Sequence, residues 1–234
     1  MKRQFSENNL EMMDQPNADP KVVADDLRNL RIINRYFGGL STLQNAVVPI
    51  AMKTKPGEIV TFLDLATGSG DQPVSLAKAF RRLEKRVQIT AVDKNEIMLR
   101  AARRYALGFH EIQFERRDIR DLPYASESYD IVLCSLAIHH FSRGDGVKLL
   151  REMNRICRLG FVVNDLSRSY IGAATAWVYT RLTTTNRMTQ YDSVASVLRA
   201  FRKDELAAMA GEAGVLPMRI FTAPLFRLVA VKEK

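Results

Sequence analysis

Short apolar runs alternate with amphipathic segments through the middle of the chain. Continuous apolar runs that are rich in β-branched and aromatic residues, typical of buried strands, begin at Glu58, Val87, Glu111, Ser128 and Gly160. Segments with helical spacing of apolar residues begin at Pro73, Asn95 and Gly144. This alternation predicts parallel βαβ units and a doubly wound sheet.

The C-terminal part of the chain follows another pattern. Residues 217–234 contain two strand-like runs with only a short turn between them. Two strands so close in sequence must pair as a hairpin, so at least one of them runs antiparallel to the rest. The predicted fold is therefore α/β: a Rossmann-like, mostly parallel, seven-stranded sheet with an antiparallel C-terminal hairpin.

Two segments lie outside the alternation. Residues 19–39 predict an amphipathic helix that starts at Asp19-Pro20 and stops at Gly38-Gly39. Residues 167–200 lie between the fifth strand and a helix that begins near Lys203, and both segments could cover the ligand-binding end of the sheet. We expect four regions: a helical N-terminal cap in residues 1–55, a Rossmann-like core in 56–166, a helical lid in 167–202, and a C-terminal helix and hairpin in 203–234.

The charge of the chain raises two further classes of partner. The 234 residues carry a formal net charge of +9, and basic residues come in bursts that begin at Arg81, Arg100 and Glu115. Nucleic acid or an anionic membrane surface would fit such a balance. Acidic residues are interleaved in two of the three bursts, which favours solvated faces instead.

The absence of long apolar runs and the small number of cysteines bear on localisation and metal binding. No apolar run reaches the length of a bilayer span, and the polar N-terminus lacks a signal-peptide core, so a cytoplasmic location is expected, with peripheral membrane association left open. The cysteines are only Cys134 and Cys157, and no metal-ligand spacing surrounds them, so we expect no bound metal.

The loop after the first strand, in "TFLDLATGSGDQP", indicates the kind of ligand. Small residues at Ala66, Gly68 and Gly70 let a ligand lie against the backbone. A dinucleotide site would have a third glycine where Pro73 stands, and Asp71 would repel a phosphate at the start of the helix. The loop therefore suits a ligand without phosphate, such as S-adenosylmethionine (SAM).

Three acids at the ends of successive strands fit the polar groups of SAM. Asp64, at the end of the first strand, can accept from the α-amino group. Asp93 ends the second strand at the spacing of an acid that holds both ribose hydroxyls. Asp118 follows the third strand and can accept from the adenine amine, while Ile119 would line the ring.

These motifs together resemble the class I SAM-dependent methyltransferases over nearly the whole chain. "LDLATGSGD", "VDKNEIML" and "RRDIRDLPYASESYDIVLCSLAIHHF" match the family's first four motifs, and Ala66 in place of the usual first glycine resembles the ubiquinone/menaquinone C-methyltransferases. "MDQPNADP…INRYFGG" and "NDLSRS" resemble a bacterial subgroup that acts on small molecules. The signature of the quinone enzymes beyond the fourth strand is absent, so quinone specificity is not implied. The expected cofactor-binding set is Asp64, Ala66, Thr67, Gly68, Gly70, Asp93, Lys94, Asp118, Ile119 and Ser135.

Methyl transfer requires alignment of nucleophile, methyl carbon and sulfur, and a phenol or enol acceptor must also lose a proton. His139 and His140 follow the fourth strand, where the methyl group should point, and histidine side chains titrate near neutral pH. Because adjacent residues project differently, at most one of the pair is expected to face the acceptor. Expected substrate contacts are Tyr170, Trp177 and Tyr191.

The sequence therefore predicts a methyltransferase that acts on a small, largely apolar acceptor. The favoured reaction is O-methylation of a phenolic or enolic hydroxyl on a polyketide- or quinone-like molecule, with S-adenosylhomocysteine (SAH) as product. C-methylation of a membrane quinone, RNA methylation and non-catalytic SAM binding are the alternatives. RNA is disfavoured because the fourth strand ends "CSLA", without the N-P-P-aromatic clamp of enzymes that methylate base amines, and because no Pro-Cys nucleophile is present.

Overall fold

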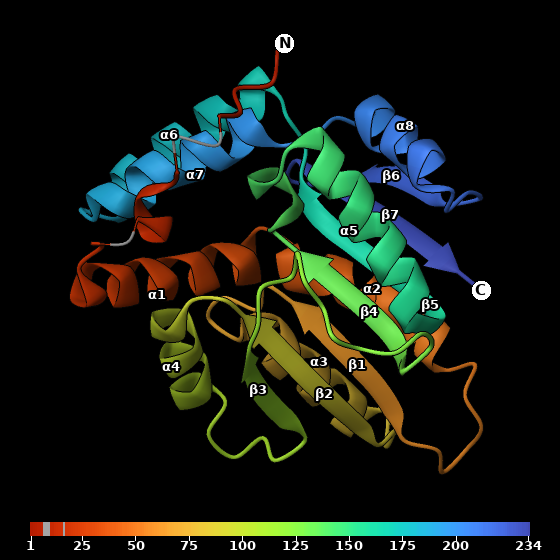
Figure 1. The fold of residues 1–234 in the computed structure, drawn as a ribbon. Coiled ribbons are helices and arrows are strands. Elements are labelled where there is room, and N and C mark those ends of the chain that lie inside the picture. Colours follow the sequence, from red (N-terminus) through yellow and green to blue (C-terminus); the bar gives the residue numbers. More distant parts are fainter. Residues whose placement is uncertain (7–9, 16) are drawn as a thin grey trace.

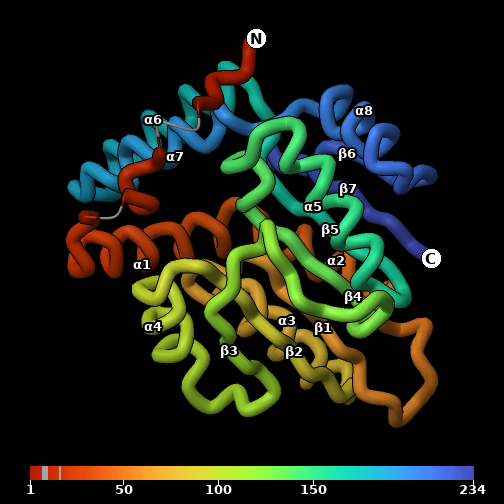
Figure 2. Tube along the Cα trace, viewed as in Figure 1, coloured from red at the N-terminus to blue at the C-terminus, as the bar shows by residue number. Residues whose placement is uncertain are grey.

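The computed structural model describes residues 1–6, 10–15 and 17–234 (Figures 1 and 2). Position 16, within the N-terminal motif at residues 13–20, lies outside the described residues. Seven strands form one sheet in the order β3-β2-β1-β4-β5-β7-β6. The strands are β1 (Val60–Leu65), β2 (Val87–Asp93), β3 (Ile112–Arg116), β4 (Tyr129–Ser135), β5 (Cys157–Leu166), β6 (Arg219–Ala223) and β7 (Arg227–Glu233).

Strands β1 to β5 pair in parallel, and β7 pairs antiparallel with both β5 and β6. This arrangement confirms the predicted α/β fold with an antiparallel C-terminal hairpin. The strand order reverses between β1 and β4, so the crevice outside the carboxyl ends of these strands is where an open α/β sheet binds its ligand.

Helices cover both faces of the sheet (Figure 1). They are α1 (Pro20–Tyr36), α2 (Gly39–Ala51), α3 (Asp71–Arg82), α4 (Glu96–Tyr105), α5 (Arg143–Ile156), α6 (Tyr170–Thr183), α7 (Arg187–Arg199) and α8 (Lys203–Ala213), with short 3₁₀ helices η1 (Met12–Asp14) and η2 (Ile138–His140). One buried apolar cluster joins a face of the sheet to α5 and α8, and a second joins the opposite face to α2 and α3.

Local signals start several helices where the sequence predicts. The Asp19 side chain accepts from Lys21 N at 2.8 Å, and Pro20 occupies the first turn of α1. The Asn95 side chain accepts from Ile97 N at 2.9 Å at the start of α4. The helix predicted from Pro73 begins two residues earlier, at Asp71, because Gly70 with a φ of 75° ends the preceding loop.

Helix α2 is not anticipated by the sequence pattern. Gly38, at φ 72°, separates it from α1, and its buried side chains, including Leu43 and Val47, pack in the cluster that covers the sheet. We therefore propose that the sheet domain begins at α2 and that the N-terminal cap consists of the residues before it.

Helices α6 and α7 lie side by side and extend across the region above α1 (Figure 1). Thr189 Oγ1 of α7 donates to Asp26 of α1 at 2.6 Å, and Asn29 Nδ2 donates to Thr184 Oγ1 at 2.9 Å. The backbone amides of Met12 and Met13 in η1 donate to Asp192 of α7 at 2.8 and 3.0 Å. These bonds tie three separate segments into a cover over the carboxyl ends of the strands. None of the helices in the described part of the chain is both long and apolar enough to cross a bilayer.

Candidate functional site

A cavity of about 440 Å³ lies between the carboxyl ends of the strands and this cover. Its walls come from the strand–helix loops, from α1, α6 and α7, from the N-terminal segment and from the β6–β7 hairpin. A volume of this size is typical of a pocket for a small molecule. Of the predicted cofactor-binding residues, all except Gly70 line it.

The loop between β1 and α3 forms the floor of the cavity. Ala66 and Gly68 adopt φ values of 56° and 55°, in the left-handed region that glycine occupies without strain. This explains why glycine is usual where Ala66 stands. A Cβ added to Gly68 would meet nothing within 4 Å, whereas one on Gly70 would lie 3.0 Å from the Ala102 Cβ of α4. Gly68 therefore leaves space for a ligand, while Gly70 allows α4 to approach the loop.

Asp64 and Asp93 differ in how far the protein satisfies them. Asp64 is 1% exposed, and its Oδ2 has no hydrogen-bond partner among the described residues. Burial raises the pKa of this carboxyl to about 7. Asp93 instead accepts from Gly68 N and Asn95 N, both at 2.9 Å, so it also holds the loop in place.

The remaining predicted cofactor residues lie at the ends of β2, β3 and β4. Asp118 is paired with Arg120, whose Nη2 lies 2.6 Å from Asp118 Oδ2, and this arginine lowers the pKa of the Asp118 carboxyl. Ile119 is buried beside Asp118 in the cavity lining. Ser135 is buried at the end of β4, and its hydroxyl has no hydrogen-bond partner in the described part of the chain.

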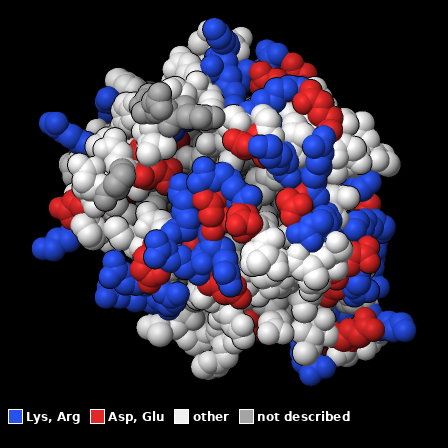
Figure 3. All heavy atoms as spheres, in the orientation of Figure 1, with Lys and Arg blue, Asp and Glu red and all other residues white. Residues whose placement is uncertain are grey.

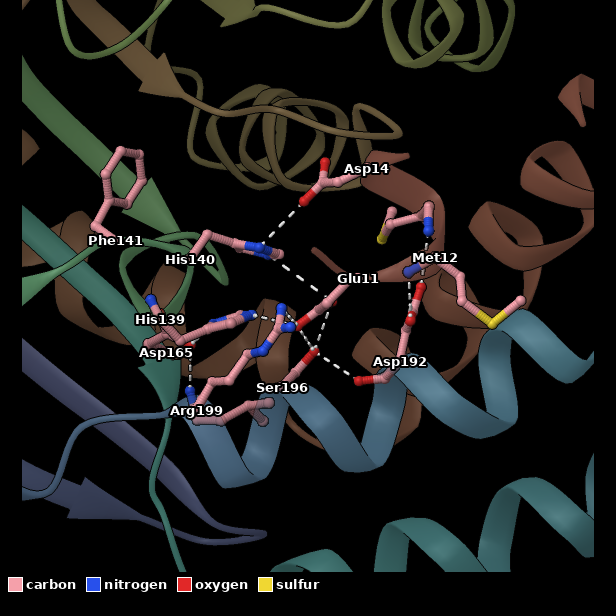
Figure 4. A network of polar contacts seen from close by, with 12 residues as sticks. Glu11, Met12, Asp14, His139, His140, Phe141, Asp165, Asp192, Ser196 and Arg199 are labelled. Atoms are coloured by element: carbon pink, nitrogen blue, oxygen red, sulfur yellow. Dashed lines mark hydrogen bonds and ion pairs between the residues drawn. The ribbon is translucent and has the colours of Figure 1, made fainter. Parts of the chain in front are cut away.

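The two histidines sit in η2, directly after β4, with different environments (Figure 4). His139 is 2% exposed, and its Nδ1 lies 2.7 Å from Asp165 Oδ1 while its backbone N donates to Asp165 Oδ2 at 3.1 Å. The His139 Nε2 has no hydrogen-bond partner among the described residues. The His140 side chain is 25% exposed, and its Nδ1 lies 3.2 Å from Asp14 Oδ2. Asp165 thus fixes the orientation of His139 and leaves its second nitrogen available.

The N-terminal segment brings Glu11 against both histidines (Figure 4). Glu11 Oε1 lies 3.8 Å from His139 Nε2, and its Oε2 lies 4.0 Å from His140 Nε2. One ligand atom from each of these three residues lies within 4.8 Å of the others, a spacing that could hold a metal ion. Arg199 Nη1 already lies 3.4 Å from Glu11 Oε1, so a cation from the chain itself serves as the counter-charge. Burial raises the pKa of Glu11 to about 7.

The aromatic residues predicted to contact the acceptor lie elsewhere. Tyr170 is 73% exposed, and Trp177 and Tyr191 are about half exposed and line a second hollow, so none of the three lines this cavity. The lid does supply cavity-lining residues, among them Thr175, Ala176 and Tyr179 of α6 and Ser196 and Val197 of α7. An apolar helix with little amphipathic contrast gives no sequence signal for which side faces inward.

Sequence reasoning missed four residues of the site. Asp165 ends β5, so the rule that found Asp64 and Asp93 at strand ends could have found it as well. Asp71 accepts from Asn34 Nδ2 at 2.9 Å and Ser69 Oγ at 3.1 Å, which joins α1 to the cofactor loop. Glu11 lies more than a hundred positions from the histidines, and Arg227 lies 193 positions from its partner Asn34, so no local pattern marks either residue.

The comparisons with known proteins agree with this geometry. A family model described as a methyltransferase domain matches residues 62–160, which hold most of β1, all of β2 to β4 and the paired histidines. Residues 62–160 are therefore similar to the methyltransferase domains that this model describes. The cofactor of this family is S-adenosylmethionine.

Curated relatives and solved structures extend the match. The ubiquinone/menaquinone biosynthesis C-methyltransferase UbiE of Bdellovibrio bacteriovorus is 35% identical over 99 residues, 42% of this chain and 40% of that protein. A demethylmenaquinone methyltransferase of Porphyromonas gingivalis is 32% identical over 114 residues, 46% of this chain and 44% of that protein. The chain thus spans less than half the length of these relatives.

The fold as a whole resembles two solved methyltransferase structures. The plantazolicin methyltransferase BpumL in complex with SAH has a TM-score of 0.67 at 13% identity and covers 96% of this chain and 93% of its own. A SAM-dependent methyltransferase from Aquifex aeolicus has a TM-score of 0.64 at 16% identity and covers 92% of this chain and 97% of its own. At these identities the likeness concerns the fold.

The methyltransferase domain offers groups that fit SAM. The unpartnered Asp64 Oδ2 is a buried acceptor that needs a donor, which the α-ammonium of SAM provides. Gly68 leaves open space beside the Asp93 carboxylate, where a ribose would lie. An uncharged wall is present at Ile119, where the adenine would lie.

Proposed function

We propose that this protein transfers a methyl group from SAM to a hydroxyl of a small, largely apolar, phenolic or enolic acceptor. One observation carries the proposal. The buried His139 Nε2, without a hydrogen-bond partner among the described residues, lines the same cavity as the cofactor loop. A general base beside the methyl donor is what an acceptor with an ionisable hydroxyl requires.

The residues divide the work of the reaction between alignment and proton removal. SAM supplies an electrophilic methyl group on its sulfonium. Asp64, Asp93 and Ile119 would hold the two ends of the cofactor, and positioning of this kind contributes up to roughly 7–11 kcal/mol when the geometry is ideal. His139 Nε2 takes the acceptor proton, and Asp165 at Nδ1 stabilises the imidazolium that forms.

The wall facing the histidines fits an apolar acceptor. Helix α1 contributes Leu27, Leu30 and Ile33 to the lining, and Leu136 and Phe141 flank the histidines. Glu11 stands at the polar end of this space, 3.8 Å from His139 Nε2, with a carboxyl whose pKa of about 7 lets it share the abstracted proton. A planar molecule would fit this cavity if its hydroxyl lay at the histidines and its apolar surface lay against α1.

C-methylation is a second candidate, because both curated relatives described above bear names of quinone-pathway methyltransferases. An enol or phenol that loses its proton to His139 can react at oxygen or at the adjacent ring carbon. The same base therefore serves both reactions, and the acceptor's orientation decides between them.

A methyl-transfer assay with isotopically labelled SAM tests the proposal. The acceptors are simple phenols, pyrones, quinols and bulk RNA, and NMR of the labelled product distinguishes O-methyl from C-methyl carbons. We expect label on the oxygen of a phenol or pyrone, and the His110→Gln variant, whose histidine lies outside the cavity lining, should behave as wild type. Label found only in RNA would overturn the proposal.

A further inference from the structure

Arg227, the first residue of β7, is a buried cation whose donors are mostly unused. It is 2% exposed and is among the largest fully buried side chains in the described part of the chain. Its Nη2 donates to Asn34 Oδ1 at 3.2 Å, but its Nε and Nη1 have no hydrogen-bond partner among the described residues. Burial lowers the pKa of this guanidinium to about 10, so it remains charged at neutral pH.

The nearby carboxylates do not form ion pairs with Arg227. Asp165 and Asp71 act on the charge of Arg227, yet no ion pair within 4.0 Å joins Arg227 to any described residue. Both acids have other partners: Asp165 is bound to His139 and to Leu166 N, and Asp71 to Asn34 and Ser69. A buried guanidinium without an anion is strongly unfavourable, so the site suits an anionic partner that the described residues do not supply.

Arg227 lines the same cavity as the cofactor loop and the histidines. The planar fork of an arginine side chain matches the two oxygens of a carboxylate. Elsewhere in the cavity, Asp64 is a buried acid with an unused oxygen. Among the described residues, the cavity thus presents a buried cation and a buried acid that each keep unused hydrogen-bonding atoms, which suits a ligand that carries both an ammonium and a carboxylate.

We propose that Arg227 binds a carboxylate within the cavity, either the α-carboxylate of the SAM methionine or an acidic group on the methyl acceptor. Only the acceptor alternative rests on the proposed function. From the sequence, Asp64 is expected to bind the ammonium, and Arg35 is a candidate for the carboxylate. In the structure Arg35, at the end of α1, is exposed, does not line the cavity, and lies over Tyr36 with 5.8 Å between its Cζ and the ring centroid.

Gly39 supports this role of Arg227. A Cβ at this position would lie 2.9 Å from Arg227 Nη2 and 3.2 Å from both Arg227 Cζ and Asn34 Oδ1. The glycine thus allows the guanidinium to lie against the start of α2. A Gly39→Ala substitution should displace the guanidinium without removing its charge, so it tests position separately from charge.

Calorimetric titrations separate the two sources of the carboxylate. The probes are SAH and 5′-methylthioadenosine, which has the same nucleoside thioether but lacks the amino-acid end. If the cofactor supplies the carboxylate, Arg227→Gln should weaken SAH binding roughly 10- to 100-fold and leave methylthioadenosine binding unchanged. Arg227→Lys, which keeps the charge but not the fork, and Gly39→Ala should show smaller losses of the same kind.

A second titration covers the acceptor. Benzoate and its neutral isostere benzamide are added to protein saturated with SAH. If the acceptor supplies the carboxylate, Arg227→Gln should leave SAH affinity intact and abolish the preference for benzoate over benzamide.

The control is Arg219→Gln, on an exposed position of the same hairpin, which should bind every probe as wild type. Circular dichroism verifies folding, and Arg227→Lys and Gly39→Ala stand in if Arg227→Gln does not fold. Two results together overturn the proposal. The folded variants bind SAH with unchanged affinity, and they bind benzoate, or fail to bind it, to the same extent as wild type. These titrations involve no methyl transfer, so they remain decisive even if the acceptor class proposed above is wrong.

Discussion

The Asp93 carboxylate both binds loop amides and lines the proposed cofactor site. Its carboxylate holds the loop through Gly68 N and Asn95 N, each at 2.9 Å, and it lines the space where ribose would bind. A single side chain therefore holds the loop and, in the proposed site, would also contact the ligand, so its removal should act on both.

Asp93→Ala should weaken SAM binding by tenfold or more. The substitution removes charge-assisted hydrogen bonds to ribose, each worth about 1.5–3 kcal/mol, and frees the loop amides. Calorimetric titration with SAM measures the effect, with Asp121→Ala, outside the cavity lining, as a control. Unchanged affinity would remove Asp93 from the site.

His139→Gln should lower turnover of a weakly acidic phenol by about 10²-fold or more while SAM affinity stays the same. The reason is that in the proposed reaction His139 would face the acceptor, whereas Asp64 and Asp93 would bind the cofactor's polar groups. Steady-state rates and SAM titrations of His139→Gln and His140→Gln provide the measurement. If both variants keep the full rate on such a phenol, alignment alone drives the reaction and neither histidine is the base.

Asp64 should make the ligand-free protein less stable as pH rises from 5 to 8. Its folded-state pKa of about 7 lies above the ordinary value of 3.8, so between these values the folded state holds more protons than the unfolded state. Stability from this group therefore falls with increasing pH and levels off above pH 7. Thermal unfolding of Asp64→Asn should show a smaller loss over this range, and curves that run parallel to wild type would contradict the assignment.

At the scale of elements, α2 is a helix that is absent from the sequence prediction although its buried side chains recur at helical spacing. Leu43, Val47 and Ile50 are buried while Ser41 and Asn45 are exposed, but Pro49 and the glycines at the start of the segment weigh against a helix when the sequence is considered alone. Packing against the sheet and α3 determines its conformation. The strands β1, β2 and β4 were predictable because strands buried on both faces are rich in apolar and β-branched residues.

Leu43→Ala should lower the free energy of unfolding by about 2–5 kcal/mol. Leu43 is fully buried in the cluster between α2 and the sheet, so the substitution leaves a cavity. Urea denaturation measures the loss. Leu182→Ala on α6, where the leucine is 81% exposed, is the matched control and should change stability by no more than about 0.5 kcal/mol. An equally small effect at Leu43 would mean that α2 does not form part of the cooperative core.

At the scale of the whole molecule, sequence reasoning predicted those site residues that a local sequence pattern marks. Acids at strand ends follow from the geometry of parallel sheets, and the paired histidines follow a strand directly. The contacts of Glu11 and Arg227 join segments far apart in the chain, so only the folded arrangement reveals them. The direction of side chains on α6 was equally hidden, and Trp177 accordingly lies outside the cavity.

The surface charge shows a mixed arrangement that bears on the RNA alternative. Basic and acidic side chains are intermixed over the face seen in Figure 3. Several arginines of the basic bursts are paired, among them Arg103 with Glu96 at 3.0 Å and Arg120 with Asp118 at 2.6 Å. Paired charges on an irregular surface offer little to a phosphate backbone.

RNA binding should therefore be weak and non-specific, with a Kd of roughly 10⁻⁴–10⁻⁶ M at physiological salt. Filter binding of bulk RNA at about 50 and 200 mM salt measures both the affinity and its salt dependence. Submicromolar binding that persists at physiological salt would contradict a small-molecule acceptor.

Only part of the cavity wall lies within the residues that match the methyltransferase family model. The range that matches the methyltransferase family, 62–160, carries the cofactor loop and the histidines, while α1, α6, α7, the N-terminal segment and Arg227 lie outside it. Substitutions in α6 and α7 can therefore alter the proposed acceptor wall without changing the cofactor loop. Exchange of α6 and α7 with those of a related methyltransferase should change the acceptor preference and leave SAM binding intact, because Asn34 and Arg227 stay in place.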